Sequence, residues 1–216
     1  MTSHLADLAP YLGSFGRPAE TVLQDLESFC ALLLKWNAVQ NLVSRETEGD
    51  VWRRHIIDSL QVLPLIRPTD RWILDLGSGG GLPAIPLAIA LKSTGRRVTM
   101  VEPVGKKAAF LRTAIRELKL DADVRNVRIE QIDSRETGPA DLVTSRALAS
   151  LTQLCSWMAP FFGPQTHAVL HKGREHPGEL RETGLAWNVD VILTESVTGD
   201  GGVLLELTNL SAKATS

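Results

Sequence analysis

The sequence predicts an α/β protein whose mostly parallel sheet is covered by helices on both faces. From Arg71 onward, short apolar runs alternate with segments of helical periodicity, which is typical of strands joined by helical crossovers. The residues before Arg71 show only helical periodicity, so they form a helical N-terminal extension. Near the C-terminus a short glycine-rich loop joins two apolar runs. Because parallel strands need a long crossover, this loop predicts a closing antiparallel hairpin.

The N-terminal extension, residues 1–70, is expected to hold two helices packed on the main domain. Pro18 suits the first turn of the first helix, where its missing N–H costs little. Asp50 is a suitable N-cap for the second helix, which stops at Pro64. Apolar residues recur at helical spacing in both helices: Val22, Leu26, Phe29, Leu33 and Trp36, then Trp52, Ile56, Leu60 and Leu63.

The main domain, residues 71–210, is expected to alternate strands with helices. Strands are predicted at Trp72–Leu76, Val98–Glu102, Val124–Glu130, Asp141–Ser145, His167–His171, Val189–Val197 and Val203–Thr208. Helices are predicted over Leu82–Ser93, Lys106–Lys119 and Leu151–Met158, and near Pro177–Gly184. The loop from Thr198 to Gly202 closes the hairpin. The tail after Leu210, residues 211–216, is expected to fray.

Composition favours a reduced, cytoplasmic, soluble protein with no membrane segment and no metal site. The chain has 216 residues, of which 44% are hydrophobic and 22% charged. Cys30 and Cys155 form no C-x-x-C pair, which argues against a disulfide scaffold or a zinc site. The net charge of -2 argues against wholesale coating of nucleic acid. Between Arg96 and Arg135, however, ten Lys/Arg face six Asp/Glu, so either a local basic surface or an ordinary solvated helix face is indicated.

The strongest chemical signal is the segment from Ile73 to Pro83, where a strand runs into a glycine turn that opens a helix. Gly77, Gly79 and Gly81 form G-x-G-x-G, and Leu82 stands where a dinucleotide fingerprint has its third glycine. The Gly-Lys-Ser/Thr ending of a P-loop is absent. Glycines let a backbone approach a ligand closely, and ligands bind beyond the carboxyl ends of parallel strands. The turn therefore suits a nucleoside ligand without a pyrophosphate.

Two acidic residues at the ends of the next two predicted strands point to an adenosine site. Glu102 can accept hydrogen bonds from both hydroxyls of a ribose, because a carboxylate is an acceptor only. In the pair Ile129-Glu130, the carboxylate can take the adenine amino hydrogens. Each carboxylate alone could be a surface charge. Together, beside the glycine turn, they favour the adenosine site.

Several segments, in this order along the chain, resemble bacterial small-subunit rRNA guanine-N7 methyltransferases, a class I methyltransferase family once named for glucose-inhibited division. They are Lys35-Trp36-Asn37 with Asn41-Leu42, His55-Ile56-Ile57-Asp58-Ser59, Gly77 through Pro86, Gly105-Lys106-Lys107, Phe110-Leu111-Arg112, Ser145-Arg146-Ala147 and Lys172-Gly173. The resemblance implies a seven-stranded sheet with its last strand reversed and S-adenosylmethionine as methyl donor. It also implies a guanine in the 530 loop of 16S rRNA as target, free or within a partly assembled small ribosomal subunit.

The resemblance also implies cofactor contacts, which extend the adenosine site. The residues expected to contact the cofactor are Gly77, Ser78, Gly79, Gly81, Leu82, Glu102, Ile129, Glu130 and Arg146. Arg146 could clamp the methionine carboxylate or an RNA phosphate, or remain a surface arginine. The loop departs slightly from the family pattern, with Ser78 where others carry Thr, Gly80 where Pro or Ala is usual, and Ala84 where Gly is frequent. Glu102 stands where many relatives have aspartate.

Basic residues near the expected rim are candidates for RNA phosphates, although each alone could be a solvated charge. They are Arg53, Arg54, Lys106, Lys107, Arg112, Lys172 and Arg174. His55 and Asp58 lie one helical turn apart and could pair with each other, cap a neighbouring loop or contact RNA; a structural pairing is expected. We assign no catalytic residue, because guanine N7 has a free lone pair and no proton to lose. Holding N7 in line with the methyl group is enough.

The sequence leaves other functions open. A class I methyltransferase that acts on a small molecule or a protein would share the fold and the cofactor site. An NAD-dependent oxidoreductase is disfavoured by Leu82 and by the absence of a Tyr/Lys or zinc-ligand set. A non-catalytic RNA-binding protein is a third alternative. The protein is expected to be a monomer.

Overall fold

The sheet has seven strands in the order β3-β2-β1-β4-β5-β7-β6. The computed structural model describes residues 2–13, 16–199 and 201–214. The strands are β1 (Trp72–Leu76), β2 (Arg97–Val101), β3 (Ala122–Arg125), β4 (Leu142–Arg146), β5 (His167–Lys172), β6 (Trp187–Glu195) and β7 (Val203–Ala212). Neighbours are parallel except at β7, which runs antiparallel to both β5 and β6. The prediction of a mostly parallel sheet with a reversed last strand is confirmed.

The chain changes direction in the sheet between β1 and β4. It leaves β1 outward through β2 and β3, then returns to pair β4 with the other edge of β1, where Asp75 lies opposite Thr144. Crossovers on the two sides of such a point run over opposite faces of the sheet. They therefore leave a crevice beyond the carboxyl ends of β1 and β4, which is where ligands bind in open α/β sheets.

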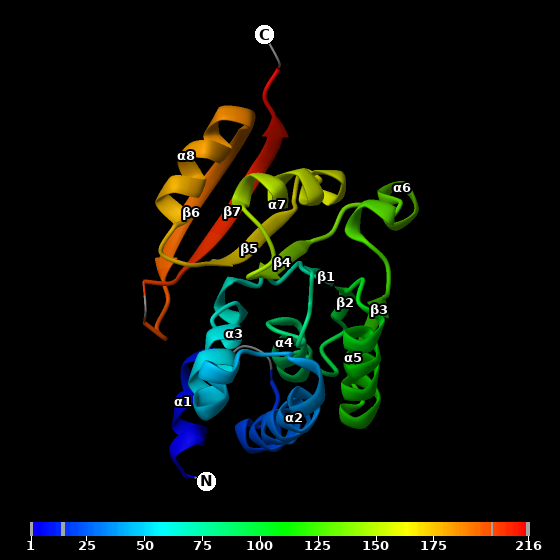
Figure 1. Cartoon of the computed structure of the whole chain (residues 1–216), viewed down its shortest axis with the longest axis vertical. Helices are drawn as coiled ribbons and strands as arrows, with labels where there is room; N and C mark the ends of the chain where they lie inside the picture. Colours follow the sequence, from blue (N-terminus) through cyan, green and yellow to red (C-terminus); the bar gives the residue numbers. More distant parts are fainter. Residues whose placement is uncertain (1, 14–15, 200, 215–216) are drawn as a thin grey trace.

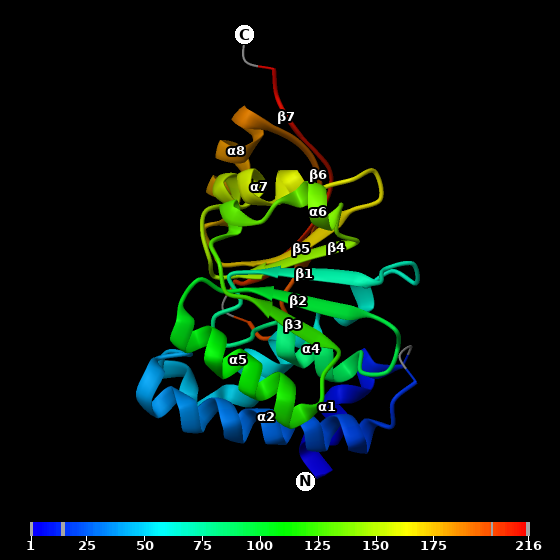
Figure 2. The same ribbon diagram turned by 90° about the vertical axis from the view of Figure 1, so that its right-hand side faces the viewer.

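Helices cover both faces of the sheet. Figure 2 shows α1 (Thr2–Leu12), α2 (Ala19–Gln40), α4 (Ala84–Ala90) and α5 (Gly105–Leu118) on one side. On the other side lie α6 (Ser134–Thr137), α7 (Leu151–Met158) and α8 (His176–Ala186). Alternate residues of a strand point to opposite faces, so Ile73 joins the core under the first group while Leu74 and Leu76 join the core under the second.

The N-terminal extension shares its core with the main domain. Val22 and Leu26 of α2 are buried in the same cluster as Ile85 and Leu87 of α4, and Figure 1 shows α2 and α4 side by side. The expected first helix is confirmed as α2. The preceding helix α1 was not predicted, although Leu5, Leu8 and Leu12 recur in it at helical spacing, because Pro10, which disfavours a helix interior, lies inside it.

The second helix of the extension differs in its ends from the prediction. Chain segments 45–50 and 52–57 form a 3-10 turn, η1 (Arg45–Asp50), and a π-helical turn, η2 (Trp52–Ile57), which leads into α3 (Asp58–Leu60). Asp50 accepts a hydrogen bond from the Arg53 N–H (3.3 Å), as an N-cap does. The helix ends at Leu60, and Pro64 lies in a separate 3-10 turn, η3 (Leu63–Leu65).

Three boundaries in the main domain correct the predictions. The helix expected over residues 82–93 is shorter, as α4. Strand β3 ends at Arg125, because the Asn126 side chain donates hydrogen bonds to the carbonyls of Glu102 (2.8 Å) and Pro103 (3.1 Å) at the end of the ladder. Glu130 therefore lies in a 3-10 turn, η4 (Ile129–Gln131), and not at a strand tip.

The C-terminal strand is longer than predicted. β7 continues to Ala212, which pairs with Trp187, so the expected fraying after Leu210 is wrong for residues 211 and 212. Residues 215 and 216 of the expected tail lie outside the described residues. Within the ranges that the structure describes, no helix has the length and apolar character needed to cross a bilayer.

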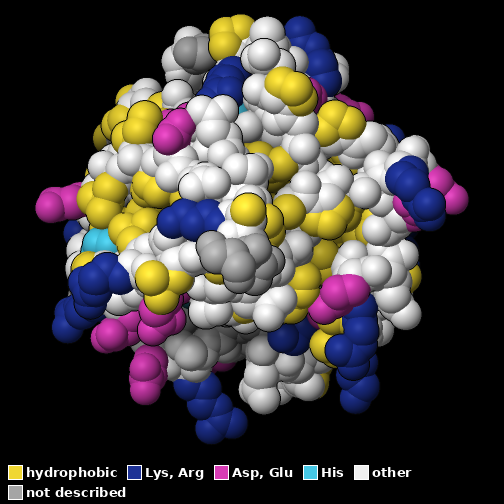
Figure 3. Space-filling model, turned by 90° about the horizontal axis from the view of Figure 1, so that it is seen from above, with side chains coloured by type: hydrophobic (Ala, Val, Ile, Leu, Met, Phe, Trp, Pro, Cys, Tyr) yellow, Lys and Arg dark blue, Asp and Glu magenta, His cyan; other side chains and the backbone are white. Residues whose placement is uncertain are grey.

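The end of the molecule that carries α7 and α8 is not a basic surface. Figure 3 looks onto this end and shows apolar side chains over much of the middle, with charged side chains of both signs mostly toward the rim. Leu185 of α8 and Ile192 of the edge strand β6 are among the most exposed large apolar residues of the described chain, at 82% and 64%. Any nucleic-acid surface must therefore be sought elsewhere.

Candidate active site

A cavity of about 460 Å³ opens beyond the carboxyl ends of β1 and β2, where the topology leaves its crevice. The main domain contributes the glycine turn, the segment after β2 and the segment after β4, while the N-terminal extension contributes the residues after α2. The lining residues are Leu42, Val43, Ser44, His55, Gly77, Ser78, Gly79, Gly80, Leu82, Glu102, Pro103, Val104, Lys107, Arg146, Ala147 and Leu148.

The glycine turn requires its glycines for backbone conformation and for close packing. Gly77, Gly79 and Gly81 have φ values of 70°, 53° and 78°, in the left-handed region that other residues rarely adopt. A Cβ at Gly77 would come within 2.5 Å of the Leu148 side chain, and one at Gly81 within 2.5 Å of Ile85. Gly79 has no such neighbour and lines the cavity, so the ligand can approach the backbone there.

Glu102 follows β2 and fixes the glycine turn in place. The side chain is only 4% exposed, and its Oε2 accepts a hydrogen bond from the Gly79 N–H (2.8 Å). Its Oε1 accepts from the Val104 N–H (2.8 Å). Each carboxylate oxygen has a second lone pair, so the group can still accept hydrogen bonds from a ribose. The predicted position of Glu102 beside the glycine turn is confirmed.

Asp75 lies beneath this turn as a second buried carboxyl group. Its Oδ1 accepts a hydrogen bond from the Thr144 hydroxyl (2.7 Å), while its Oδ2 has no hydrogen-bond partner among the described residues. Burial, which opposes the charged form, raises the pKa of Asp75 to about 7. This carboxyl group was not singled out from the sequence, although it stands within the strand-to-turn motif.

Ile129 and Glu130 do not line the cavity. Because the strand ends early, the Ile129 side chain is buried in the core under α7. The exposed Glu130 carboxylate accepts a hydrogen bond from the Trp157 indole N–H of α7 (2.8 Å). Neither residue therefore joins Glu102 and the glycine turn in the lining of the cavity, and the Glu130 carboxylate contacts α7 instead.

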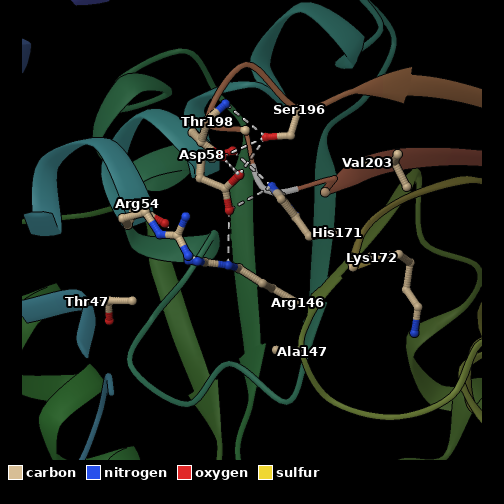
Figure 4. Close-up of a pocket in the computed structure, with 13 residues that line it drawn as sticks. Thr47, Arg54, Asp58, Arg146, Ala147, His171, Lys172, Ser196, Thr198 and Val203 are labelled. Atoms are coloured by element: carbon tan, nitrogen blue, oxygen red, sulfur yellow. Dashed lines mark hydrogen bonds and ion pairs between the residues drawn. The ribbon is translucent and has the colours of Figure 1, made fainter. Parts of the chain in front are cut away.

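Arg146 is the last residue of β4 and separates the first cavity from a second one, of about 290 Å³. Its Nε lies 3.1 Å from Asp58 Oδ2 (Figure 4). Its Nη2 donates to the Arg54 carbonyl (2.8 Å) and to His55 Nδ1 (3.0 Å). Arg146 is thus held by the N-terminal extension and is not a free surface arginine.

Asp58 is the centre of the hydrogen bonds around the second cavity. Its Oδ1 accepts from the hydroxyls of Ser196 and Thr198, both at 3.2 Å, on the loop between β6 and β7. The His171 Nε2–H of β5 donates to the Asp58 carbonyl (2.9 Å). Figure 4 shows these side chains converging on Asp58 from separate parts of the chain. The second cavity is lined by Thr47, Arg54, Asp58, Arg146, Ala147, His171, Lys172, Gly173, Ser196, Thr198, Gly199, Gly202 and Val203.

His55 and Asp58 do not pair with each other as expected, because both side chains bind Arg146 instead. Burial and the nearby Arg146 charge lower the pKa of His55 to about 4, so the ring is neutral near pH 7. Its Nδ1 accepts from Arg146, which leaves the proton on Nε2, where it donates to the Thr47 hydroxyl (2.9 Å). The sequence motif contains both residues, but Arg146, the partner that they share, lies about ninety positions further along the chain.

The basic residues expected to contact RNA have different surroundings. Lys107 lines the first cavity and Arg54 the second. Lys106 and Arg112 are exposed on α5. Arg53 is exposed, and its guanidinium reaches the Val197 carbonyl (3.5 Å).

Two further candidates lie at the end of β5 and just after it. Arg174 is exposed, and its side chain lies across Gly201, where a Cβ would come within 2.8 Å of Arg174 Cγ. Lys172 is only 8% exposed, and its Nζ lies 2.6 Å from Glu179 Oε2 of α8. The expectation that Lys172 is an accessible cation at the rim is therefore corrected, because its charge is already compensated inside the protein. Over the described parts of the chain, no group of His, Cys, Asp or Glu side chains could hold a metal ion.

Solved structures share this fold at low sequence identity. The glycopeptide N-methyltransferase MtfA, solved with S-adenosylmethionine, matches with a TM-score of 0.58 and 12% identity over 71% of this chain and 93% of its own. The cofactor-bound protein Rv0187 from MTB matches with a TM-score of 0.58 and 18% identity over 94% of this chain and 95% of its own. These likenesses establish the class I methyltransferase fold.

Sequence relatives are much more similar. The Acidiphilium cryptum protein named ribosomal RNA small subunit methyltransferase G is 44% identical over 191 residues, which cover 88% of this chain and 86% of the relative. Its namesake from Cereibacter sphaeroides is 42% identical over 86% of this chain and 88% of the relative. The family model described as rRNA small subunit methyltransferase G matches residues 22–204. The chain therefore belongs to the rRNA small subunit methyltransferase G family.

Proposed function

We propose that the protein transfers a methyl group from S-adenosylmethionine to N7 of a guanine in the 530 loop of 16S rRNA. The observation that carries this proposal is the family match over residues 22–204, together with relatives named for small subunit ribosomal RNA. The match includes the glycine turn, Glu102, Asp58 and Arg146, which build both cavities.

The first cavity has the features that an adenosine-containing cofactor needs. Its glycine turn leaves room for close approach at Gly79, and its buried Glu102 offers acceptors for ribose hydroxyls. When bound, S-adenosylmethionine supplies an electrophilic methyl group. We assign its contacts to Gly77, Ser78, Gly79, Leu82, Glu102 and Arg146, which line the cavity, and to Gly81 of the same turn. The placements of Ile129 and Glu130 lend no support to their expected cofactor contacts.

The second cavity is our candidate for the target base, because Arg146 and Ala147 line both cavities. Guanine N7 attacks through a lone pair and releases no proton, so the chain needs no general base. N7 gains positive charge as the methyl group is transferred, and a bare guanidinium nearby would oppose this. Asp58 compensates the charge of Arg146 at 3.1 Å, so Arg146 can form a wall of the site without that penalty. The remaining contribution is to orient the base and exclude water.

We assign contacts with RNA phosphates to basic residues around the two cavities and on α5. Contacts to phosphates position RNA without reading its sequence. The assigned residues are Arg53, Arg54, Lys106, Lys107, Arg112 and Arg174. We propose that the enzyme acts as a monomer in the cytoplasm on 16S rRNA, either free or in a partly assembled small subunit. A small-molecule or protein methyltransferase and an NAD-dependent oxidoreductase are not favoured by the family match.

Chemical mapping of 16S rRNA tests the target atom. Methylation at N7 fixes a positive charge on the ring and labilises the glycosidic bond, so reduction followed by aniline cleaves the RNA there. We expect cleavage at one guanine of the 530 loop in RNA from cells that contain the protein, and none in RNA from cells that lack it. Equal cleavage in both samples, or a methyl group on another atom, would overturn the assignment.

A further inference from the structure

Residues 41–47, here called the strap, cross from the end of α2 to the 3-10 turn η1 and form the outer wall of the site. Leu42, Val43 and Ser44 line the first cavity, and Thr47 lines the second. The strap lies directly against the glycine turn, since a Cβ at Gly80 would come within 3.0 Å of the Leu42 carbonyl oxygen. A small displacement of the strap would therefore change the shape of the first cavity.

Asn37, in the last turn of α2, holds the strap through two hydrogen bonds and binds the residue just beyond it through a third. Its side chain is buried, at 5% exposed, and does not line either cavity. Its Oδ1 accepts from the backbone N–H groups of Leu42 and Val43 (2.9 Å for Val43). Its Nδ2 donates to the carboxylate of Glu48, just beyond the strap. Asn41, at φ 46°, ends α2 and turns the chain so that these N–H groups face Asn37.

The far end of the strap is connected to Arg146. The Thr47 hydroxyl accepts from His55 Nε2 (2.9 Å), and His55 Nδ1 accepts from Arg146 Nη2 (3.0 Å). The strap therefore joins the glycine turn of the first cavity to the arginine that separates the two cavities. The position of the strap therefore affects the binding of the cofactor in the first cavity and of the target base in the second.

We infer that Asn37 is a positioning residue, which sets the affinity of the first cavity for its cofactor by holding the strap against the glycine turn. The inference rests on the proposed cofactor. The chemistry at this position demands an amide, because one end must accept from two backbone N–H groups while the other donates to a carboxylate. Alanine would leave the N–H groups of the partly buried Leu42 and the buried Val43 without their acceptor, and aspartate would place a second carboxylate against Glu48.

Binding of S-adenosylhomocysteine, followed by titration calorimetry, tests the inference without relying on turnover. We expect Asn37→Ala to weaken binding by about tenfold or more, since a lost buried hydrogen bond of ordinary strength corresponds to that factor. Asn37→Asp should weaken it similarly. The double variant Asn37→Asp/Glu48→Gln restores the pattern with donor and acceptor exchanged, and should bind within about threefold of the wild type. Glu48→Gln alone should bind like the wild type, because its amide oxygen still accepts from Asn37.

Thr166→Ala is the matched control. Thr166 is also buried, and its hydroxyl accepts from the Gly163 N–H (2.8 Å) and donates to the Ala140 carbonyl, but at the amino ends of the strands, far from the cavities. It should lower the melting temperature without changing cofactor affinity. Affinity of Asn37→Ala within twofold of the wild type, or an equal loss in Thr166→Ala, would overturn the inference.

The remaining outcomes are also decisive. If Asn37→Ala does not fold, the inference is tested by comparing the affinity of Asn37→Asp with that of the double variant. If the double variant does not recover affinity, the inference is overturned. A wild-type protein that binds no S-adenosylhomocysteine would instead contradict the proposed cofactor. The two failures are therefore distinguishable.

Discussion

At the scale of single residues, buried carboxyl groups organise the site through hydrogen bonds to their surroundings. Glu102 accepts from two backbone N–H groups, and Asp58 accepts from Ser196 and Thr198 while it pairs with Arg146. Asp75 is different, because only one of its oxygens has a hydrogen-bond partner in the part of the chain that the structure describes. Asp75 is therefore the carboxyl group for which removal of the charge has the clearest consequence.

Replacing Asp75 by asparagine should change how stability depends on pH. Burial raises the pKa of Asp75 from 3.8 to about 7, so between these values the folded protein binds more protons than the unfolded chain. Wild-type stability therefore loses a contribution as pH rises from about 4 to about 7. Asp75→Asn keeps the acceptor for Thr144 and cannot ionise. The free energy of unfolding of Asp75→Asn minus that of the wild type should therefore be larger at pH 8 than at pH 5, as measured by urea denaturation.

An unchanged difference between the two proteins at pH 5 and pH 8 would show that Asp75 does not titrate in this range. The denaturant slope serves as the control. It should be the same for both proteins, because the substitution leaves the surface exposed on unfolding unaltered.

The sequence predicts single site residues well where the chemistry is local. The glycine turn and Glu102 follow from a strand-to-turn pattern within one short stretch. Glu130 was misplaced, because its predicted role needed β3 to end at residue 130, whereas the strand ends at Arg125. The pairing of Arg146 with Asp58 joins residues far apart in the chain, and no local pattern encodes it.

At the scale of elements, periodicity predicts where helices and strands occur better than where they end. α7 has the predicted bounds, since the Ser150 hydroxyl caps it by accepting a hydrogen bond from the Gln153 N–H (3.4 Å) and Pro160 follows it. The role of the extension was underestimated. The sequence predicted only an appended helical segment. In the structure the extension shares one core with the main domain, and its strap and Asp58 complete the lining of the two cavities.

The connection between extension and sheet provides an element-scale prediction. Asp70 accepts from the Arg67 N–H (2.7 Å) and from the fully buried His167 of β5 (3.0 Å). Glu206 of β7 lies 3.5 Å from His167 Nδ1 and 3.2 Å from Arg67. Asp70→Ala should lower the free energy of unfolding by about 3 kcal/mol, because it leaves the Arg67 N–H and the buried His167 ring without their acceptor. Urea denaturation measures the loss.

The same variant should keep its rate of methyl transfer at a temperature where it is folded. Asp70 lies at the amino ends of the strands, whereas both cavities lie at the carboxyl ends. A stability loss below about 0.5 kcal/mol, the range of ordinary surface substitutions, would contradict the predicted contribution of the network. A reduced rate in folded protein would contradict the separation of stability from activity.

At the scale of the whole molecule, the mostly parallel sheet and the closing hairpin were predictable, because alternation and a glycine-rich loop are short-range patterns. The order of the strands was not predicted from them, because β7 lies between β5 and β6, and no local pattern encodes that insertion. The distribution of charge over the surface was only partly predictable. The net charge is -2, yet α5, which begins beside the first cavity, carries Lys106, Arg112 and Arg116 as exposed residues, while the end with α8 exposes apolar side chains.

This distribution predicts RNA binding that weakens as salt rises and that depends on one side of the molecule. Each phosphate contact releases bound counterions, so affinity for single-stranded RNA falls with salt at a slope of roughly 0.7 per contact. Lys106→Gln/Arg112→Gln/Arg116→Gln should reduce the slope by up to about 2 and weaken binding at low salt. Arg135→Gln/Arg181→Gln/Lys213→Gln removes the same charge from exposed positions on α6, on α8 and beyond β7, and should leave the slope unchanged. Equal changes in both triple variants, measured by filter binding across a salt series, would show that net charge and not the α5 surface governs RNA binding.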